Sequence, residues 1–573
     1  MSVETPRKRG PVIALVAAAF ALAAVGAAAL LVNVAEKKTE ARASFVKLVE
    51  VGENDTDPEK WGKNFPRELD GYKRTSEPTG TKYGGSAGGA EGNLPPQKSA
   101  RDPWLKRIFA GYLFAVDYRD RRGHAFALTD QENTKRNVPA EKKQSGNCAH
   151  CHASIMPLYR DLGQKAAPTA SPAEQLQVGL AKVGEMDYWD AHKALEGLTG
   201  GKVHPVSCVD CHDPGNMEIR VTRPAFIAAM QKLAAGTGAV PHLPSIERWR
   251  KGDKAKPYDP NLDGTRQEKR SYVCGQCHVE YFCGKGTTIF FPWAEGLTVE
   301  NAEHVYNGIK DAKGNRFKDW VHAETGMEVL KAQHPEFEMW SQGIHARSGV
   351  ACADCHMSYK REGATKLAEH WVRSPLLSAN RSCATCHPYS DEELKARVEG
   401  IQDRHFALMT RAGNAAVAMI DAIVAVRKPY DDQNREAATA KAKEKLEKDE
   451  AFLKLDKEGQ EKKMGAEVKA NLLAAWREVV AKTPAIAELG ELQRSAQWRL
   501  DMVAAENSMG FHAPQEMARI LGESIDLSRQ AQVKAVALGA PVVAMNEPAP
   551  APDAKADAKK PAAVKPAAAP AKK

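Results

Sequence analysis

The sequence predicts a mainly α-helical fold with few short strands and long C-terminal helices. Five Cys-x-x-Cys-His motifs are separated by short helical runs and turn residues, with little period-2 alternation. Near Asp391 the composition changes to Ala, Lys, Glu and Leu recurring at helical spacing. These observations divide the chain into four regions: residues 1–42, 43–390, 391–540 and 541–573.

Residues 1–42 have the pattern of an export segment. Arg7-Lys-Arg precedes an apolar run from Pro11 to Val32, and charged residues return between Glu36 and Arg42. The run is near the roughly 20 residues that span a bilayer, and its basic flank places the rest of the chain outside the cytoplasm. The segment is a signal peptide or a signal anchor, and no clear cleavage site follows it. We expect a periplasmic protein that either loses this segment or stays anchored in the membrane through it.

The formal charge of +8 does not indicate a nucleic-acid partner. Residues 1–10 and the tail from Gly539 together supply +5 of it. No long basic run interleaved with aromatic residues lies between them, so nucleic acid is excluded as a partner. Residues 541–573 are a Pro/Ala/Lys low-complexity segment and are predicted to be disordered.

Ten of the eleven cysteines belong to the five motifs. Zinc needs two such pairs, or one pair and two further ligands, for each ion; five pairs cannot be shared out evenly, and zinc does not require a histidine after every pair. In a c-type haem site the two cysteines form thioethers to the porphyrin and the histidine binds the iron. The sequence therefore predicts a multihaem cytochrome c with five covalently bound haems, attached at Cys148, Cys151 and His152; Cys208, Cys211 and His212; Cys274, Cys277 and His278; Cys352, Cys355 and His356; and Cys383, Cys386 and His387.

Five haems in one chain are compatible with two classes of function. In an electron carrier every iron has two axial ligands and nothing reacts. In an enzyme one iron keeps an open position beside polar groups. The chain has 17 histidines, so 12 remain after the motif histidines, which is enough to close every haem. Histidine counting therefore leaves both classes open.

The C-terminal region predicts long helices. Apolar residues from Leu394 to Met419 alternate spacings of four and three, and Pro429 is expected to end this helix. Charged helical sequence follows, and then apolar-periodic helices over Val468–Leu538, interrupted near Pro484 and Gly510. We expect a helical hairpin that serves packing or dimerisation.

Several motifs together resemble one family. Cys274-Gly-Gln-Cys-His-Val-Glu-Tyr281 is followed by Lys331-Ala-Gln-His-Pro335 and by Gly349-Val-Ala-Cys-Ala-Asp-Cys-His-Met357. With all five attachment motifs in the same order, these closely resemble the pentahaem cytochrome c nitrite reductases that form ammonia. The resemblance covers residues from about Trp104 to Leu521. It implies a periplasmic enzyme that reduces nitrite to ammonium with six electrons.

The resemblance also implies a catalytic site at the first haem, Cys148–His152. The distal arginine, tyrosine and histidine of the family correspond to Arg136, Tyr281 and His334, and His334 is expected to deliver protons near neutral pH. A neighbouring calcium ion is implied, with ligands from Glu280, Tyr281, Lys331 and Gln333. The distal ligands of the second, third, fourth and fifth haems would be His370, His124, His512 and His345.

Each assigned side chain also has a plainer alternative. Tyr281 could be a packed aromatic, Arg136 a surface charge, His334 a closing distal ligand and Glu280 the partner of a lysine. The chain also departs from the best-known members, which have lysine where His152 stands; a subgroup with Cys-x-x-Cys-His has the same histidine. The helical region from about Lys428 to Leu489 is longer than in typical members, and Cys283 has no evident partner.

The family's electron donor is a membrane-bound tetrahaem quinol dehydrogenase, and a homodimer through the long helices is implied as well. Two alternatives remain. One is a pentahaem electron carrier with every haem six-coordinate. The other keeps the enzyme but makes hydroxylamine or sulfite its main substrate.

Overall fold

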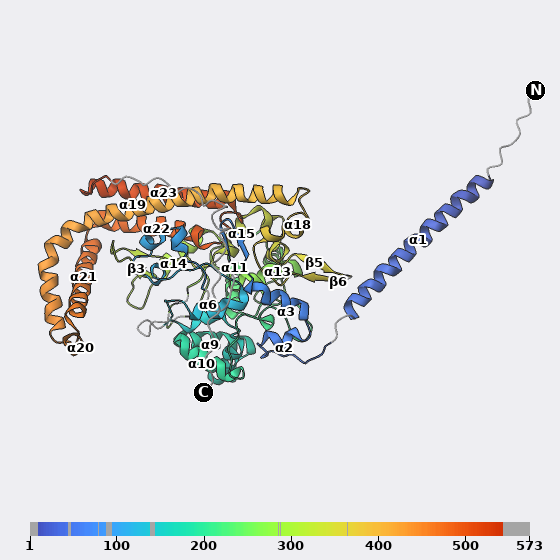
Figure 1. Cartoon of the computed structure of the whole chain (residues 1–573), viewed down its shortest axis with the longest axis horizontal. Coiled ribbons are helices and arrows are strands. Elements are labelled where there is room, and N and C mark those ends of the chain that lie inside the picture. Colours follow the sequence, from blue (N-terminus) through green and yellow to red (C-terminus); the bar gives the residue numbers. More distant parts are fainter. Residues whose placement is uncertain are drawn as a thin grey trace, which may run out of the picture.

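The computed structural model describes residues 10–43, 47–77, 79–86, 94–137, 144–282, 284, 286, 288–363 and 365–542. These residues form a mainly helical protein, as predicted, in which the strands are short hairpins (Figure 1). Three antiparallel pairs are found: β1 (Thr79–Thr81) with β2 (Gly84–Ser86), β3 (Trp320–Val321) with β4 (Glu328–Val329), and β5 (Tyr359–Glu362) with β6 (Thr365–Ala368). Cys283 and almost all of the predicted disordered tail lie outside the described residues.

The body is built from many short helices connected by turns, which matches the expected organisation around haems. Its helices are α2 (Pro58–Gly62), α3 (Pro66–Lys73), α4 (Lys98–Arg101), α5 (Leu105–Ile108), α6 (Ala127–Glu132), α7 (Ala149–His152), α8 (Met156–Ala166), α9 (Pro172–Glu185), α10 (Tyr188–Leu198), α11 (Pro224–Ala235), α12 (Pro244–Lys251), α13 (Arg266–Gly275), α14 (Val299–Gly308), α15 (Glu336–Gln342), α16 (Ile344–Arg347), α17 (Cys352–His356) and α18 (Ala379–Ser382).

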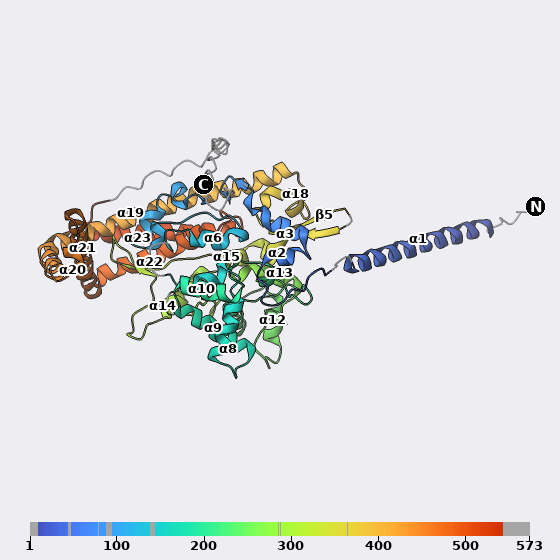
Figure 2. The same ribbon diagram turned by 60° about the horizontal axis from the view of Figure 1, so that its bottom comes forward.

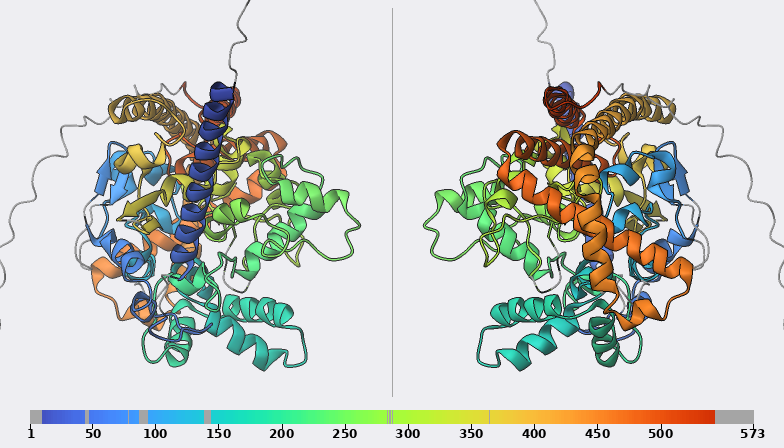
Figure 3. Two further views of the ribbon diagram at one scale, coloured as in Figure 1. Left: turned by 90° about the vertical axis from the view of Figure 1, so that its right-hand side faces the viewer. Right: turned by 90° about the vertical axis from the view of Figure 1, so that its left-hand side faces the viewer.

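The C-terminal region forms the long helices. They are α19 (Asp391–Leu446), α20 (Glu450–Leu453), α21 (Lys457–Lys482), α22 (Pro484–Ala505) and α23 (Pro514–Ala537). α19 and α23 run along the top of the body in Figure 1 with α22 below them, and apolar side chains of all three form a buried cluster with residues 104–118 and 299–339. The group α8, α9 and α10 lies at the opposite end of the body (Figures 2 and 3).

The N-terminal helix α1 (Gly10–Ala43) stands apart from the body in Figure 1. Within Ile13–Lys37 an 18-residue stretch has a mean hydropathy of 2.6, and none of that stretch is buried against other elements. By length and composition it could cross a membrane. In the described part of the chain the other helix that passes this test is α19, which is mostly buried in the core as expected for a packed helix.

Pro429 does not end α19, so that prediction was wrong. The helix continues to Leu446, and Figure 1 shows it bending downward at its far end. Proline removes one backbone donor and kinks a helix, but neighbouring bonds can carry the helix past it. Arg427 supplies such bonds, because its side chain donates to the Glu324 carbonyl at 3.0 Å and pairs with Asp431 at 3.1 Å.

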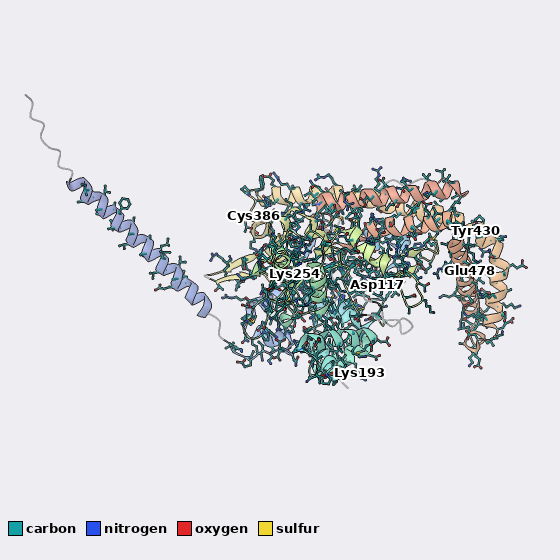
Figure 4. All side chains as sticks on the ribbon, turned by 180° about the vertical axis from the view of Figure 1, so that it is seen from behind. Asp117, Lys193, Lys254, Cys386, Tyr430 and Glu478 are labelled. Carbon is teal, nitrogen blue, oxygen red and sulfur yellow. The ribbon has the colours of Figure 1, made fainter. Side chains whose placement is uncertain are left out.

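Residues 430–482 form a helical arm in which the end of α19 packs against α21, with α20 at the tip. Tyr430 and Glu478 mark this arm in Figure 4, where it projects from the body. The Asn471 side chain donates to the Ala438 carbonyl at 3.0 Å, which joins the two helices. The helical region from about Lys428 to Leu489 therefore contains a helical hairpin.

Trp476 anchors the arm to the body. Its indole is 1% exposed, lies tilted by 53° against the Tyr430 ring with centroids 5.2 Å apart, and donates to the Thr325 carbonyl at 2.7 Å. We expect Trp476→Ala to cost about 3–5 kcal/mol locally and to expose the arm to limited proteolysis, read by mass spectrometry of the fragments. Leu453→Ala, at the exposed tip, is the control. Unchanged cleavage of the Trp476 variant would contradict the anchoring role.

The helix α13 positions the third attachment motif. Its N-terminus is fixed by a capping box between Thr265 and Glu268, and Cys274 lies in its last turn. The residue after Cys274 is Gly275, where only glycine fits, because a Cβ atom there would lie 2.7 Å from the Phe337 ring. The chain can then turn so that His278, Glu280 and Tyr281 follow within one short segment.

Candidate functional site: paired histidines and the polar groups near His152

Four of the five motif histidines face a second histidine across a constant gap. The pairs are His212 with His370, His278 with His124, His356 with His512, and His387 with His345, and the ring centroids are 6.3 Å apart in each. An iron about 2.0 Å from each nitrogen, with the centroid about 1.1 Å further, places two imidazole centroids about 6.2 Å apart. The gaps therefore fit haem iron held from both faces, in the pairings that the resemblance implies.

The orientation of the motif histidines also fits iron binding. The Nδ1 atoms of His152, His212 and His356 lie 2.8, 3.1 and 3.1 Å from the carbonyl oxygens of Ala127, Met217 and Arg373. A carbonyl oxygen can only accept, so Nδ1 carries the proton and Nε2 keeps the lone pair that a metal needs. The donor set therefore suits an axial imidazole ligand.

The attachment motifs lie against one another. Cys151 of the first motif is in hydrogen-bond contact with Cys277 of the third, and Cys274 of the third with Cys352 of the fourth. None of the ten motif cysteines forms a disulfide in the described part of the chain. The cysteines are thus available for haem attachment, and the haems they would hold are close neighbours.

A buried ion pair joins the first three motifs. Arg223 is fully buried, bonds to Asp210 of the second motif at 2.7 Å and donates to the carbonyls of His150 and Ala153 at the first motif, at 2.7 and 2.9 Å. Gln276 of the third motif accepts from the Arg223 backbone at 3.1 Å and donates to the Asp210 carbonyl at 3.0 Å. Arg223 therefore fixes the three motifs relative to one another.

His152 differs from the other motif histidines. Among the described residues, no second histidine ring faces it at the separation of the four pairs. Burial lowers the pKa of His152 to about 4, and the nearby charges of Arg136 and Arg121 act in the same direction. The surroundings of His152 are thus cationic.

Tyr281 and His334 are neighbours, as the resemblance implies. Their rings are nearly parallel, at 29°, with centroids 6.4 Å apart. The Nη2 atom of Arg121 lies 3.2 Å from Nδ1 of His334. Burial, and then the charge of Arg121, hold the pKa of His334 well below its usual value. Both effects favour the neutral ring, in which one nitrogen donates and the other accepts, and proton delivery by His334 stays a prediction.

Arg136 lies beside His152 but does not contact His334. Its guanidinium carbon is 4.3 Å from the centroid of the Phe114 ring, and its carbonyl accepts from the Gln144 side chain at 3.1 Å. The guanidinium in contact with His334 is that of Arg121, which the sequence reasoning missed. Its one sequence signal is its place three residues before His124, in Arg121-Arg-Gly-His.

The predicted calcium ligands also come together. Glu280 is fully buried; its Oε2 accepts from the Gln333 backbone at 2.6 Å and its Oε1 from the Tyr306 hydroxyl at 2.8 Å. Burial raises the pKa of this carboxyl well above its usual value. Among the described residues no cationic side chain forms a salt bridge with Glu280. A buried carboxylate beside the Lys331–Gln333 segment fits a hard cation bound through oxygen.

Two acidic residues that were not predicted from the sequence hold the Lys331–Gln333 segment in place. Asp501 of α22 accepts from the Ala332 backbone at 2.8 Å and pairs with the Lys331 ammonium at 3.1 Å. Asp319 accepts from the Lys331 backbone at 2.8 Å. The long C-terminal helices thus position the loop beside the pocket.

Paired histidines and five attachment motifs on a helical scaffold define a multihaem c-type cytochrome. The family model for cytochrome c552 matches residues 57–573, and the chain belongs to this family. Cytochrome c-552 of Parabacteroides distasonis is 31% identical over 480 residues, covering 83% of this chain and 75% of that protein. Cytochrome c-552 of Bacteroides thetaiotaomicron is 32% identical over 476 residues, covering 82% and 74%.

A solved structure has the same fold. It is the cytochrome c nitrite reductase from Desulfovibrio desulfuricans, in which two calcium sites are described for the catalytic subunit. Its TM-score with this chain is 0.60 at 25% identity, and the match covers 86% of this chain and 90% of the other.

Proposed function

We propose that this protein is a periplasmic, ammonia-forming nitrite reductase that uses five c-type haems, of which the one attached at Cys148–His152 is the catalytic haem. One observation carries the proposal. Four motif histidines face a second histidine, whereas His152 is near the charges of Arg121 and Arg136 and near His334, whose ring lies against Tyr281. An iron held by His152 would therefore lack a second histidine ligand among the described residues and could bind a substrate instead.

The haem supplies the redox-active iron that binds and reduces the substrate when it is attached. The side chains around it act on an anion. Arg121 and Arg136 make the surroundings positive, which favours nitrite over neutral molecules. His334 donates a hydrogen bond to an oxygen of the bound anion, because donors fixed toward developing charge act strongly away from water. The hydroxyl of Tyr281, beside His334, is placed to supply a proton.

The acidic group behind the pocket supports the site. Glu280, Lys331, Gln333 and the carbonyl of Tyr281 would hold calcium, whose charge offsets the buried carboxylate and fixes Tyr281 beside His334. Burial raises the pKa of the Glu280 carboxyl well above its usual value, and it raises the pKa of Asp319 to about 7. A bound cation would keep Glu280 ionised and the loop rigid.

The remaining four haems would carry electrons to the catalytic one. Contacts between the first and third motifs, and between the third and fourth, support a continuous route. The donor would be a membrane-bound tetrahaem quinol dehydrogenase, and α1 would keep the enzyme at the membrane if it is not cleaved. Exposed Val533 and Val536 on α23 support a homodimer through the long helices.

The test is the stoichiometry of the purified holoprotein with reduced methyl viologen as the electron source. The proposal predicts six electrons consumed and one ammonium formed for each nitrite, with higher kcat/KM for nitrite than for hydroxylamine or sulfite. A higher kcat/KM for hydroxylamine or sulfite would assign the same pocket to the other substrate. No turnover of any of the three would favour the electron carrier.

A further inference from the structure

Arg121 links three features of the molecule that are distant in sequence. Its Nη2 atom lies 3.2 Å from Nδ1 of His334, 3.5 Å from the Ala505 carbonyl oxygen and 3.8 Å from Oε1 of Glu336. The side chain is one-third exposed, at 34%. These contacts connect the loop before His124, the segment after Gln333 and the end of α22.

The contact with His334 determines which ring nitrogen carries the proton. A guanidinium has five N–H donors and no acceptor, so the bond is possible only when Nδ1 of His334 accepts. The proton of the neutral ring then resides on Nε2. Without this contact either nitrogen could carry the proton. The tautomer protonated on Nδ1 would present a lone pair at Nε2 instead of a donor.

Glu336 holds Arg121 in this position. Its side chain is 13% exposed and accepts a close hydrogen bond from Asn507. The same Oε1 lies 4.0 Å from Nδ1 of His278, the histidine that faces His124. The Glu336 side chain therefore lies between Arg121 and the third attachment motif and is held there by Asn507.

We propose that Arg121 is a positioning residue of the pocket, which fixes His334 in the tautomer with the proton on Nε2, with Glu336 as its anchor. This tautomer favours binding of an anion that has an oxygen acceptor, such as nitrite. The inference rests on the proposed function, because it concerns how the same pocket binds its substrate. This role differs from a direct attraction between the Arg121 charge and the anion, because Arg121 acts through His334.

A double-mutant cycle separates these two roles. The variants are Arg121→Met, His334→Ala and the pair together, with Arg121→Lys as the conservative replacement and Arg397→Met, at an exposed ion pair on α19, as the control. The measurements are the Kd for nitrite from optical titration of the oxidised holoprotein, kcat and KM, haem content and melting temperature.

We expect Arg121→Met to weaken nitrite binding by about tenfold, the size of one charge-assisted hydrogen bond, and to have little further effect when His334 is already alanine. Arg121→Lys, which keeps a donor, should retain most of the affinity. Equal losses in both backgrounds would show an independent charge effect and overturn the proposal, as would wild-type affinity in Arg121→Met. A wild-type protein that does not reduce nitrite would instead overturn the proposed function.

Discussion

Replacing His334 by alanine is expected to lower the kcat for nitrite by about 10²–10³-fold, the usual cost of removing one fixed donor to a developing anion. The ring is buried, its Nδ1 contacts Arg121 and it lies parallel to Tyr281. Its loss removes the Nε2–H donor and leaves Arg121 without this partner. Haem content should be unchanged, because His334 is not among the four facing histidine pairs.

Two further variants make this test specific. His334→Gln keeps an amide N–H donor and should retain more turnover than His334→Ala. His304→Ala removes a histidine whose side chain is 73% exposed, and should leave turnover at the wild-type level. Wild-type turnover by His334→Ala, with all haems attached, would show that this histidine has no catalytic role.

Arg223→Met is expected to destabilise the protein by about 3–5 kcal/mol. The change leaves Asp210 as an uncompensated buried charge and removes the donors to His150 and Ala153. Because the pair joins the first three attachment motifs, spectra of the haems should change together with stability. The urea midpoint and the reduction potentials of the haems are the measurements.

The partner variant gives the control. Asp210→Asn in the Arg223→Met background removes the unpaired buried charge and keeps an acceptor for the Ser207 backbone. It should recover part of the lost stability. Arg397→Met should change neither quantity. An Arg223→Met protein with the wild-type urea midpoint would show that the ion pair does not hold the motifs together.

The helical class and the number of attachment sites could be predicted because both are local. Cys-x-x-Cys-His is complete within five residues, and apolar spacing identifies α19, α22 and α23 without knowledge of their partners. Pro429 shows the limit of local rules. The helix continues past it, and two residues earlier Arg427 donates to the Glu324 carbonyl, a contact between residues that lie 103 positions apart.

The candidate site was predictable only in part for the same reason. Tyr281 and His334 stand in recognisable motifs, and the structure brings them together. Arg121 and Asp501 do not stand in such motifs. They reach His334 and Lys331 across 213 and 170 residues, so only the folded chain shows that they support the pocket. Arg136 stands nearer the predicted motif but packs on Phe114.

The central claim is that the haem held by His152 has an open face while the other four do not. Electron paramagnetic resonance of the oxidised holoprotein tests it most directly. The account predicts one high-spin ferric signal beside low-spin signals from bis-histidine haems, with the high-spin signal alone shifting when nitrite is added. Low-spin signals from every haem, unchanged by nitrite, would contradict the account and identify the protein as an electron carrier.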